Sequence, residues 1–279
     1  MPGSLVFNQI QRLWILKLYS LPRNIPTVDR SRGMGTMENS KPTLHYLQNS
    51  GSQQSLWLLE ELGIEYDLVL HIRETGRAPA ALKDTHPLGK APQLVTSSGR
   101  VIAERSAIAF YLIETYDSEG RFKVPSPELD PDWNSNDNDK FREEQLFSLA
   151  LTALNQFITM DITFGVFANH APFLVRQLMQ GLKWGFGKLY LDAEIDNCFK
   201  VLDAELEGRE YFNGTKSPTR LDFVMQWYVD SAVQGVRLDL SLYPRVKEWF
   251  ERCISRDAWK RAVKKGNGYD LEFWKMKMR

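Results

Sequence analysis

The stretch from His86 to Tyr111, HPLGKAPQLVTSSGRVIAERSAIAFY, decides the fold that this sequence predicts. Turn residues lead to Pro92, and a short apolar run after it predicts a strand that starts beside a proline, which cannot donate to a strand ladder. Residues 97–100 are typical of a tight hairpin turn, and residues 101–103 predict the returning strand. A helix with one apolar face follows at once.

The start of that helix is a candidate binding site. Glu104, Arg105 and Ser106 lie where backbone N–H groups have no partner inside the helix and where the helix dipole is positive. Such a helix end binds a carboxylate, and Glu104 is placed to receive an ammonium group. A ligand end that carries both groups, such as an amino acid, fits this pattern. The residues alone leave open that Glu104 merely favours the helix start.

The motifs on either side of the hairpin resemble a known family. Residues 87–94 read Pro-Leu-Gly-Lys-x-Pro-x-Leu, and residues 102–112 read Ile-Ala-Glu-x-x-Ala-Ile-x-x-Tyr-Leu. This order resembles the glutathione-binding half of cytosolic glutathione transferases, most of all the fungal and bacterial branch with a serine near the N-terminus. The resemblance covers roughly residues 41–264 and implies that the peptide bond before Pro92 is cis.

The family resemblance and the order of predicted elements give a two-domain fold. We expect an N-terminal α/β domain, thioredoxin-like and glutathione-binding, at residues 41–122, and a linker rich in Pro, Asp, Asn and Ser at residues 123–138. An all-helical bundle domain that binds the second substrate is expected at residues 139–279. Residues 1–40 form an N-terminal extension outside the family pattern.

The extension, residues 1–36 in particular, is rich in arginine and poor in acids, and it has an apolar centre. This composition is typical of a mitochondrial transit peptide. A disordered extension explains it as well, and so does an upstream start codon chosen over Met34 or Met37. We therefore expect a cytoplasmic protein, or a mitochondrial one if the extension acts as a transit peptide.

The amino-acid composition argues against several classes of binding partner. The 279 residues carry 35 basic and 35 acidic side chains, so a general partner such as nucleic acid or an anionic membrane is not indicated. No apolar run predicts an integral membrane segment. The four histidines lack metal-ligand spacing, so no metal is expected. Cys198 and Cys253 lie far apart in helical patterns, which favours two buried reduced thiols.

The second half reads as helices throughout. Lys140–Met160 predicts one long helix, and Ala171–Leu206 predicts another, with a possible interruption near Gly185 or Gly187. Apolar side chains on the first of these helices face the expected second substrate. We name Met160 and Phe164 as candidates for its hydrophobic site, although most apolar residues at helical spacing belong to the core.

A capping motif marks a later helix. Thr219-x-x-Asp222 has the form of a capping box, with Asp in place of the usual Glu or Gln. The family resemblance implies that this motif is a fold-stabilising cap. We therefore assign Thr219 and Asp222 a structural role, as we do Pro92.

Ser50 is the candidate for thiol activation. A free thiol has a pKa near 8.5, and a hydroxyl donor with the positive start of a helix lowers it. Ser50 lies in the loop between the first strand and the first helix, and Trp57 is in register with the Ser-x-x-x-Arg-x-x-Trp pattern of the family. Ser52 and Asn49 are rivals, and Tyr46 is a weaker one.

Two further residues carry family roles by resemblance. Lys90 matches the position that reaches the glycyl carboxylate of glutathione, although a lysine is more often a solvated surface residue. Ala91 matches the residue whose backbone pairs with the cysteinyl part of the peptide. With Glu104 and Arg105, these residues make up the predicted glutathione site.

Three positions depart from the family pattern. Arginines usually stand where this chain has Gly51 and Gln54, which predicts less positive charge near the sulfur. The serine that holds the γ-glutamyl carboxylate is Arg105 here. Arg105 can replace that hydroxyl with a charge-assisted bond, fill the pocket, or point to solvent and leave the backbone N–H groups free.

These features predict a glutathione transferase that conjugates the glutathione thiolate, its co-substrate, to small apolar electrophiles. The resemblance implies a homodimer. Two alternatives remain open on the sequence. One is a specialised glutathione-dependent isomerase or a tailoring enzyme of fungal metabolite biosynthesis, and the other is a non-catalytic binding module with a transferase-like fold.

Overall fold

A computed structural model of the chain describes residues 41–74, 76–124, 140–236 and 238–272. These residues belong to one compact unit, Glu38–Arg279. The predicted extension at residues 1–40, with its transit-peptide interpretation, lies outside the described residues. Nearly all of the predicted linker at residues 123–138 lies outside them too.

The first half is built on a four-stranded mixed sheet with the strand order β2-β1-β3-β4. Strand β1 pairs in parallel with β2 and antiparallel with β3, and β3 pairs antiparallel with β4. This confirms the predicted thioredoxin-like domain. Its elements are β1 (Thr43–Leu47), α2 (Ser52–Leu62), β2 (Asp67–His71), α3 (Leu82–Thr85), β3 (Gln93–Val95), β4 (Val101–Ala103) and α4 (Arg105–Tyr116).

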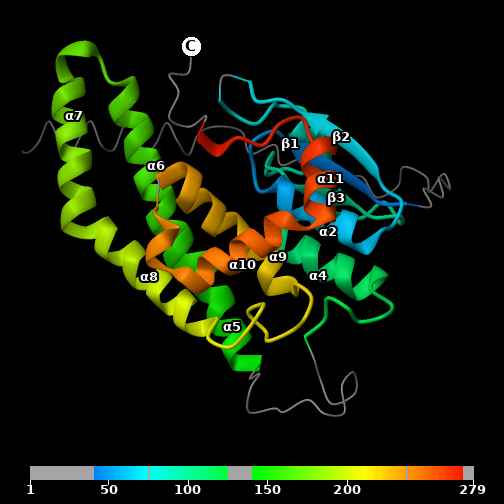
Figure 1. Ribbon diagram of the computed structural model, residues 1–279. Coiled ribbons are helices and arrows are strands. Elements are labelled where there is room, and N and C mark those ends of the chain that lie inside the picture. The colour runs from blue at the N-terminus through cyan, green and yellow to red at the C-terminus, as the bar shows by residue number, and fades with distance from the viewer. Residues whose placement is uncertain (1–40, 75, 125–139, 237, 273–279) are drawn as a thin grey trace, which may run out of the picture. The chain divides into compact units, whose positions relative to one another are not determined.

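The second half is helical, as the sequence predicts (Figure 1). Its first long helix continues to His170, beyond the predicted end at Met160, and Pro172 begins the next helix. Both long helices contain a π-helical turn, the second of them at Gly187. The elements are α5 (Lys140–Leu149), η1 (Ala150–Leu154), α6 (Asn155–His170), α7 (Phe173–Phe186), η2 (Gly187–Leu191), α8 (Asp192–Glu205), α9 (Arg220–Asp230), η3 (Ser231–Val236), η4 (Leu240–Leu242), α10 (Pro244–Ser255) and α11 (Asp257–Lys265).

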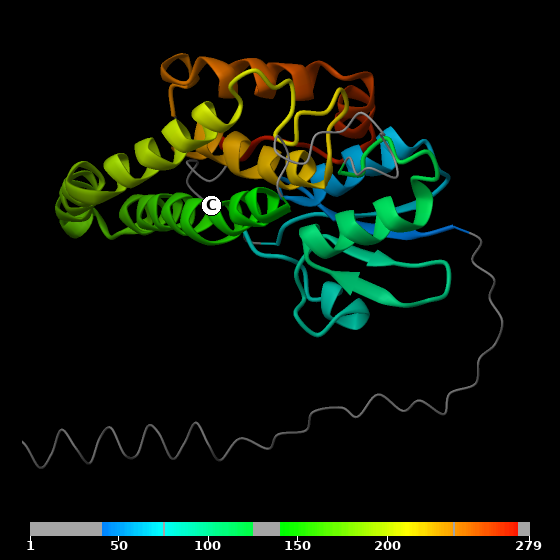
Figure 2. The same ribbon diagram turned by 90° about the horizontal axis from the view of Figure 1, so that it is seen from below.

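Helix α2 is the element on which the two halves meet. All of its residues except Glu61 are buried, and it packs against the sheet strand β1, against α4, and against α9 and α11 of the helical half. Figure 2 shows the short helix α3 on the side of the sheet opposite to α2. Burial on so many sides leaves Trp57 with no exposed surface, in contact with Phe223 and Trp259.

The C-terminal end of α2 is tied to the C-terminal helices by ion pairs. Arg256 donates to both carboxylate oxygens of Glu61, and Arg261 donates to Glu60 over 2.9 Å. Lys265 donates to the other oxygen of Glu60 over 2.5 Å. Bidentate, partly buried pairs of this kind contribute more than exposed ones. These pairs therefore hold α11 along α2.

Helix α9 begins with the predicted capping box. The carboxylate of Asp222 accepts hydrogen bonds from the backbone N–H and the hydroxyl of Thr219, at 2.7 and 2.9 Å. It also accepts from the backbone N–H of Phe212 over 3.1 Å and from the indole of Trp249 over 2.8 Å. Burial raises the pKa of Asp222, and these four donors oppose that rise.

We expect Asp222→Ala to lower the free energy of unfolding by about 3 kcal/mol or more, because it leaves four buried donors without an acceptor. Urea denaturation of the purified protein measures this. Asp192→Ala is the matched control, since Asp192 forms only an exposed pair with Lys188 and should change stability by less than about 0.5 kcal/mol. Equal denaturation midpoints for the two variants would contradict the structural role of the cap.

One continuous helix, Phe141–His170, is long and apolar enough to cross a membrane by length and composition. Within the fold it packs against α7, α9 and η3, and Asp161 near its middle pairs with Lys183 of α7 over 3.2 Å. We therefore interpret it as a helix of the folded helical half.

Candidate functional site

A cleft of about 290 Å³ brings together five of the residues that the sequence singles out. Its wall combines the loop after β1, the segment before β3, the start of α4 and one residue of α9. Ser50, Lys90, Ala91, Glu104 and Arg105 all line it. The remaining lining residues are Gly51, Arg73, Leu88, Pro92, Ala103 and Trp227.

The backbone of the cleft has two unusual points. The peptide bond between Ala91 and Pro92 is cis, as the family resemblance implies. Glu104 has a φ of +70° and a ψ of 126°, a conformation that costs a residue other than glycine of the order of 1–3 kcal/mol. It stands directly before α4, where the first backbone N–H groups have no partner within the helix. Strain at this point therefore coincides with the predicted carboxylate site.

Ser50 lines the cleft, but its hydroxyl is turned toward its own loop. Oγ of Ser50 lies 2.7 Å from the carbonyl oxygen of Leu47 and 2.9 Å from Oγ of Ser52. It also accepts from the backbone N–H of Ser52 over 3.2 Å. A hydroxyl has one proton, so donation to a ligand sulfur requires that Ser50 gives up its bond to Leu47.

The three rivals of Ser50 are placed less well. Ser52 has no exposed surface, and its hydroxyl accepts from the backbone N–H of Leu47 over 3.1 Å. The side-chain oxygen of Asn49 accepts from the backbone N–H of Asp270 over 2.8 Å. Tyr46 is buried, which raises its pKa, and it donates to Gln53. None of the three is among the lining residues of the cleft.

The side chain of Arg105 lines the cleft and packs against residues of α9. Its Nη2 donates to the hydroxyl of Tyr228 over 2.9 Å, and its guanidinium carbon lies 5.0 and 4.9 Å from the ring centroids of Trp227 and Tyr228. Burial lowers the pKa of Arg105, and its interactions with Tyr228, Tyr269 and the carboxylate of Glu104 oppose this. Its Nη1 is buried and has no hydrogen-bond acceptor among the described residues.

The guanidinium lies against Gly51. A Cβ atom built on Gly51 would lie 2.5 Å from Cδ and 2.7 Å from Nη1 of Arg105. Arg105 thus fills the space that a side chain at residue 51 would need. The sequence predicts a loss of positive charge beside Ser50 at this position. The structure corrects that expectation, because α4 supplies an arginine to the same place.

The cleft has a positive formal charge. Arg73, Lys90 and Arg105 contribute three positive charges and Glu104 one negative charge, which leaves +2. Arg73 donates from Nε and Nη2 to the carbonyl oxygens of the loop before Ser50, over 3.1 and 3.0 Å, and burial lowers its pKa to about 10. An anionic ligand is therefore favoured here.

Met160 and Phe164, the candidates for a hydrophobic substrate site, are not among the residues that line the cleft. Met160 is half-buried against the core, and Phe164 packs its ring against Phe186 at a centroid distance of 5.2 Å. Arg73 and Trp227 are lining residues that sequence reasoning missed. Trp227 lies on α9, far along the chain, and no local pattern links it to the cleft.

The C-terminal segment also reaches the Ser50 loop without a signal in the sequence. Asn49, with a φ of +51°, donates its backbone N–H to the carbonyl of Gly268 over 3.3 Å and accepts from Asp270. Leu271 is buried, and its N–H donates to Gln234 over 3.0 Å. The segment after α11 therefore holds the backbone directly before Ser50.

A buried polar network anchors this segment. The hydroxyl of Tyr269 donates to Asp230 over 2.6 Å and accepts from Gln54 over 3.1 Å. Gln54 also donates to Gln226, which donates to Asp230 over 3.3 Å. Burial raises the pKa of both Asp230 and Tyr269. Gln54, which departs from the family pattern, thereby joins α2 to α9 and the C-terminal segment.

We expect Tyr269→Phe to lower the free energy of unfolding by about 1–3 kcal/mol, because the buried carboxylate of Asp230 loses a donor. Urea denaturation monitored by tryptophan fluorescence measures the change. Tyr190→Phe is the control, since Tyr190 is exposed on η2 and its ring contacts survive the substitution. An unchanged midpoint for Tyr269→Phe would show that the network does not anchor the segment.

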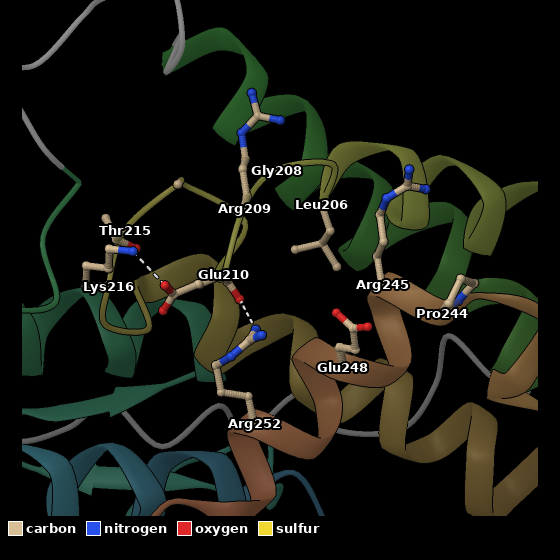
Figure 3. Close-up of a pocket in the computed structure, with 11 residues that line it drawn as sticks. Leu206, Gly208, Arg209, Glu210, Thr215, Lys216, Pro244, Arg245, Glu248 and Arg252 are labelled. Atoms are coloured by element: carbon tan, nitrogen blue, oxygen red, sulfur yellow. Dashed lines mark hydrogen bonds and ion pairs between the residues drawn. The ribbon is translucent and has the colours of Figure 1, made fainter.

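A second and larger cavity, of about 600 Å³, lies between the α8–α9 connection and α10 (Figure 3). Several of its charged groups are already engaged. Lys216 pairs with Glu210 over 2.6 Å, Arg252 donates to the backbone carbonyl of the same glutamate, and Arg245 pairs with Asp203. None of the residues predicted for the site lines it. Among the described residues no cluster of metal-ligating side chains occurs either.

Comparisons with known proteins decide the family. A family model described as the glutathione S-transferase N-terminal domain matches residues 51–115. Glutathione S-transferase 3 of Schizosaccharomyces pombe is 31% identical over 226 residues, which cover 80% of this chain and 86% of that protein. The chain belongs to the glutathione S-transferase family. This confirms the resemblance stated from the motifs.

Solved structures show the same fold. A glutathione S-transferase from Actinobacillus pleuropneumoniae has a TM-score of 0.61 and 26% identity, and covers 84% of this chain and 96% of its own. A glutathione transferase from Phanerochaete chrysosporium, in complex with oxidised glutathione, has a TM-score of 0.58 at 18% identity, with coverages of 81% and 96%. The thioredoxin-like and helical halves of this glutathione S-transferase family member are thus those of its relatives.

Proposed function

We propose that this protein binds glutathione in the cleft and conjugates it to small apolar electrophiles. The observation that carries the proposal is the convergence of Ser50, Lys90, Ala91, Glu104 and Arg105 on one cleft. Glutathione with an ionised thiol carries two carboxylates, one ammonium and one thiolate, a net charge opposite to the +2 of the lining side chains. Structural relatives crystallised with glutathione support the same ligand.

The cleft offers a partner for each charged end of the peptide. The first N–H groups of α4 take the γ-glutamyl carboxylate, and Glu104 takes the ammonium beside it. Lys90 takes the glycyl carboxylate. The backbone of Ala91 pairs with the cysteinyl part, which directs the sulfur toward Ser50 at the start of α2.

The reaction begins when the thiol loses its proton to solvent. The hydroxyl of Ser50 turns from Leu47 and donates to the sulfur, which stabilises the thiolate. The sulfur then attacks the electrophilic carbon, the C–S bond forms, and the leaving group departs with its electron pair. Leu88 and Trp227 supply the apolar side of the cleft on which the electrophile rests.

We expect Ser50→Ala to lower kcat with an activated aryl chloride at least tenfold at neutral pH, while glutathione still binds with a similar Kd. The physical reason is that the donor to the thiolate is lost while the peptide contacts remain. Stopped assays and calorimetric titration of the same preparation measure the two quantities.

Lys90→Ala is the matched comparison. It should raise the Kd for glutathione severalfold and change kcat little, because Lys90 contacts a part of the peptide that does not react. If Ser50→Ala retained full kcat, the hydroxyl would have no part in thiol activation.

We propose that the protein is a homodimer and that α6 and α7 contribute to the contact with a second copy. Figure 1 shows these helices packed side by side. They leave large apolar side chains exposed, which is uncommon on a monomer surface. The exposed set includes Phe167, Phe173, Leu174, Leu178, Leu182 and Trp184. Homodimers are general in the family.

We expect Leu178→Glu to shift the protein from dimer to monomer at micromolar concentration, because a charge is placed in a buried apolar contact. Light scattering after size exclusion gives the mass. Leu242→Glu is the control, since Leu242 is equally exposed, at 68% against 65%, but lies on η4. A dimer that survives Leu178→Glu would place the contact elsewhere.

For the location in the cell we propose the cytoplasm. The mitochondrial alternative depends on residues 1–36. A fluorescent fusion of the full chain, compared with one that starts at Met37, separates the two. Mitochondrial signal that disappears with the extension would overturn the cytoplasmic proposal.

A further inference from the structure

The cleft contains a cation, Arg105, whose guanidinium has donors left over beside its hydrogen bond to Tyr228. Nη1 of Arg105 is buried without a hydrogen-bond acceptor among the described residues, and it lies against Gly51, the residue next to Ser50. Leaving a buried charged N–H group without an acceptor is costly, and such groups in folded proteins call for an explanation. The side chain of Arg105 lines the cleft and lies against Gly51, so its charge favours an anion bound beside Ser50 even without direct contact.

We propose that the guanidinium of Arg105 lies beside the sulfur of bound glutathione and stabilises its thiolate. The inference rests on the proposed function, since it assigns a catalytic role within the same cleft. Arg105 thus acts at the sulfur, and the γ-glutamyl carboxylate that a serine at this position would hold is left to the backbone of α4.

The contacts of the side chain fix it in this place. Tyr228 accepts from Nη2, and the rings of Trp227 and Tyr228 pack against the guanidinium plane at about 5 Å. Cation–π contacts with two rings hold the charge without neutralising it, because neither ring is an anion. Nη1 and Nε lie on the side of Gly51.

The other two cations of the cleft do not fit this role as well. Arg73 donates two hydrogen bonds to backbone carbonyls of the loop before Ser50, so it fixes the loop. Lys90 is exposed and lies in the segment before Pro92, where the resemblance places the glycyl end of the peptide. Arg105 is the cation that lies against the first residues of α2.

The absence of a side chain at Gly51 makes room for Arg105. Any side chain at residue 51 would begin 2.5–2.9 Å from Cδ, Nη1 and Nε of Arg105, closer than real Cβ contacts come. An arginine at residue 51 therefore requires the side chain of Arg105 to move from this place. The family pattern has an arginine at position 51 and a serine at position 105, whereas this chain has Gly51 and Arg105. The positive charge therefore comes from the start of α4 and not from the start of α2, and it still lies beside Ser50.

The test is the pKa of the thiol of bound glutathione, measured from the ultraviolet absorbance of the thiolate and from the pH profile of kcat/KM. We expect Arg105→Ser to raise this pKa by about one unit. At a pH below the pKa, the fraction of thiolate and the value of kcat/KM should then both fall about tenfold. Gly51→Arg alone should lose activity by steric conflict. The exchange variant Gly51→Arg/Arg105→Ser should return the pKa to within a few tenths of the wild-type value.

Arg100→Ser is the control for the loss of one positive charge, since Arg100 is exposed in the β3–β4 turn outside the cleft. If Arg105→Ser fails to fold, Arg105→Gln keeps a long polar side chain with an N–H donor but without the charge, and the same rise in pKa is expected. An unchanged thiol pKa in a folded Arg105 variant overturns the inference, as does an exchange variant that recovers nothing.

The proposed function fails in a different way. If the wild-type protein shows no heat of glutathione binding, the cleft does not take this peptide, and the thiol pKa is not measured at all. If the wild-type protein binds and turns over glutathione, but the thiol pKa is the same in the wild type and in the Arg105 variants, only the role assigned to Arg105 is wrong.

Discussion

The burial of helix α2 on nearly all sides is the constraint from which most of this structure follows. A helix packed against a sheet strand, α4, α9 and α11 at once has no solvated face on which polar residues can rest. Each polar side chain of α2 therefore needs its own partner inside the protein. Glu60 and Glu61 form ion pairs with arginines and a lysine of the last helices. Gln54 forms hydrogen bonds with Gln226 and Tyr269. These pairings join the two halves around the helix that begins beside Ser50.

The same constraint explains why the C-terminal segment reaches the loop that carries Ser50. Tyr269 and Leu271 are held by groups of α9 and η3, and the backbone between them bonds to Asn49. Asn49 adopts a positive φ, which asparagine tolerates better than most residues. The loop that carries Ser50 is thus defined from three sides, by β1, by Arg73 and by the end of the chain. Precise placement of a catalytic hydroxyl needs such support, because a loop with few contacts leaves its side chains mobile.

What the sequence predicts well here depends on short-range signals. The strand at 101–103 has the predicted bounds because turn residues flank it, and the Thr219–Asp222 cap follows from a three-residue spacing. The motif around Pro92 is local, and with Ser50 and the start of α4 it identified five lining residues of one cleft. The helix predicted to end at Met160 continues to His170, and Asp161 just beyond the predicted end pairs with Lys183 of the next helix.

What the sequence does not reveal is the relation between Gly51 and Arg105. Each looks like a loss when it is examined alone, since one removes an arginine and the other removes a serine from the family pattern. Only the fold shows that the side chain of Arg105 occupies the space that a side chain at residue 51 would need. The substitution at residue 105 is tolerable for a further reason. A carboxylate at the start of α4 is bound by backbone N–H groups, which every residue except proline provides. In the proposed complex, the side chain at residue 105 is then left to serve the sulfur, so one residue offers its backbone to one end of the peptide and its charge to the reacting atom.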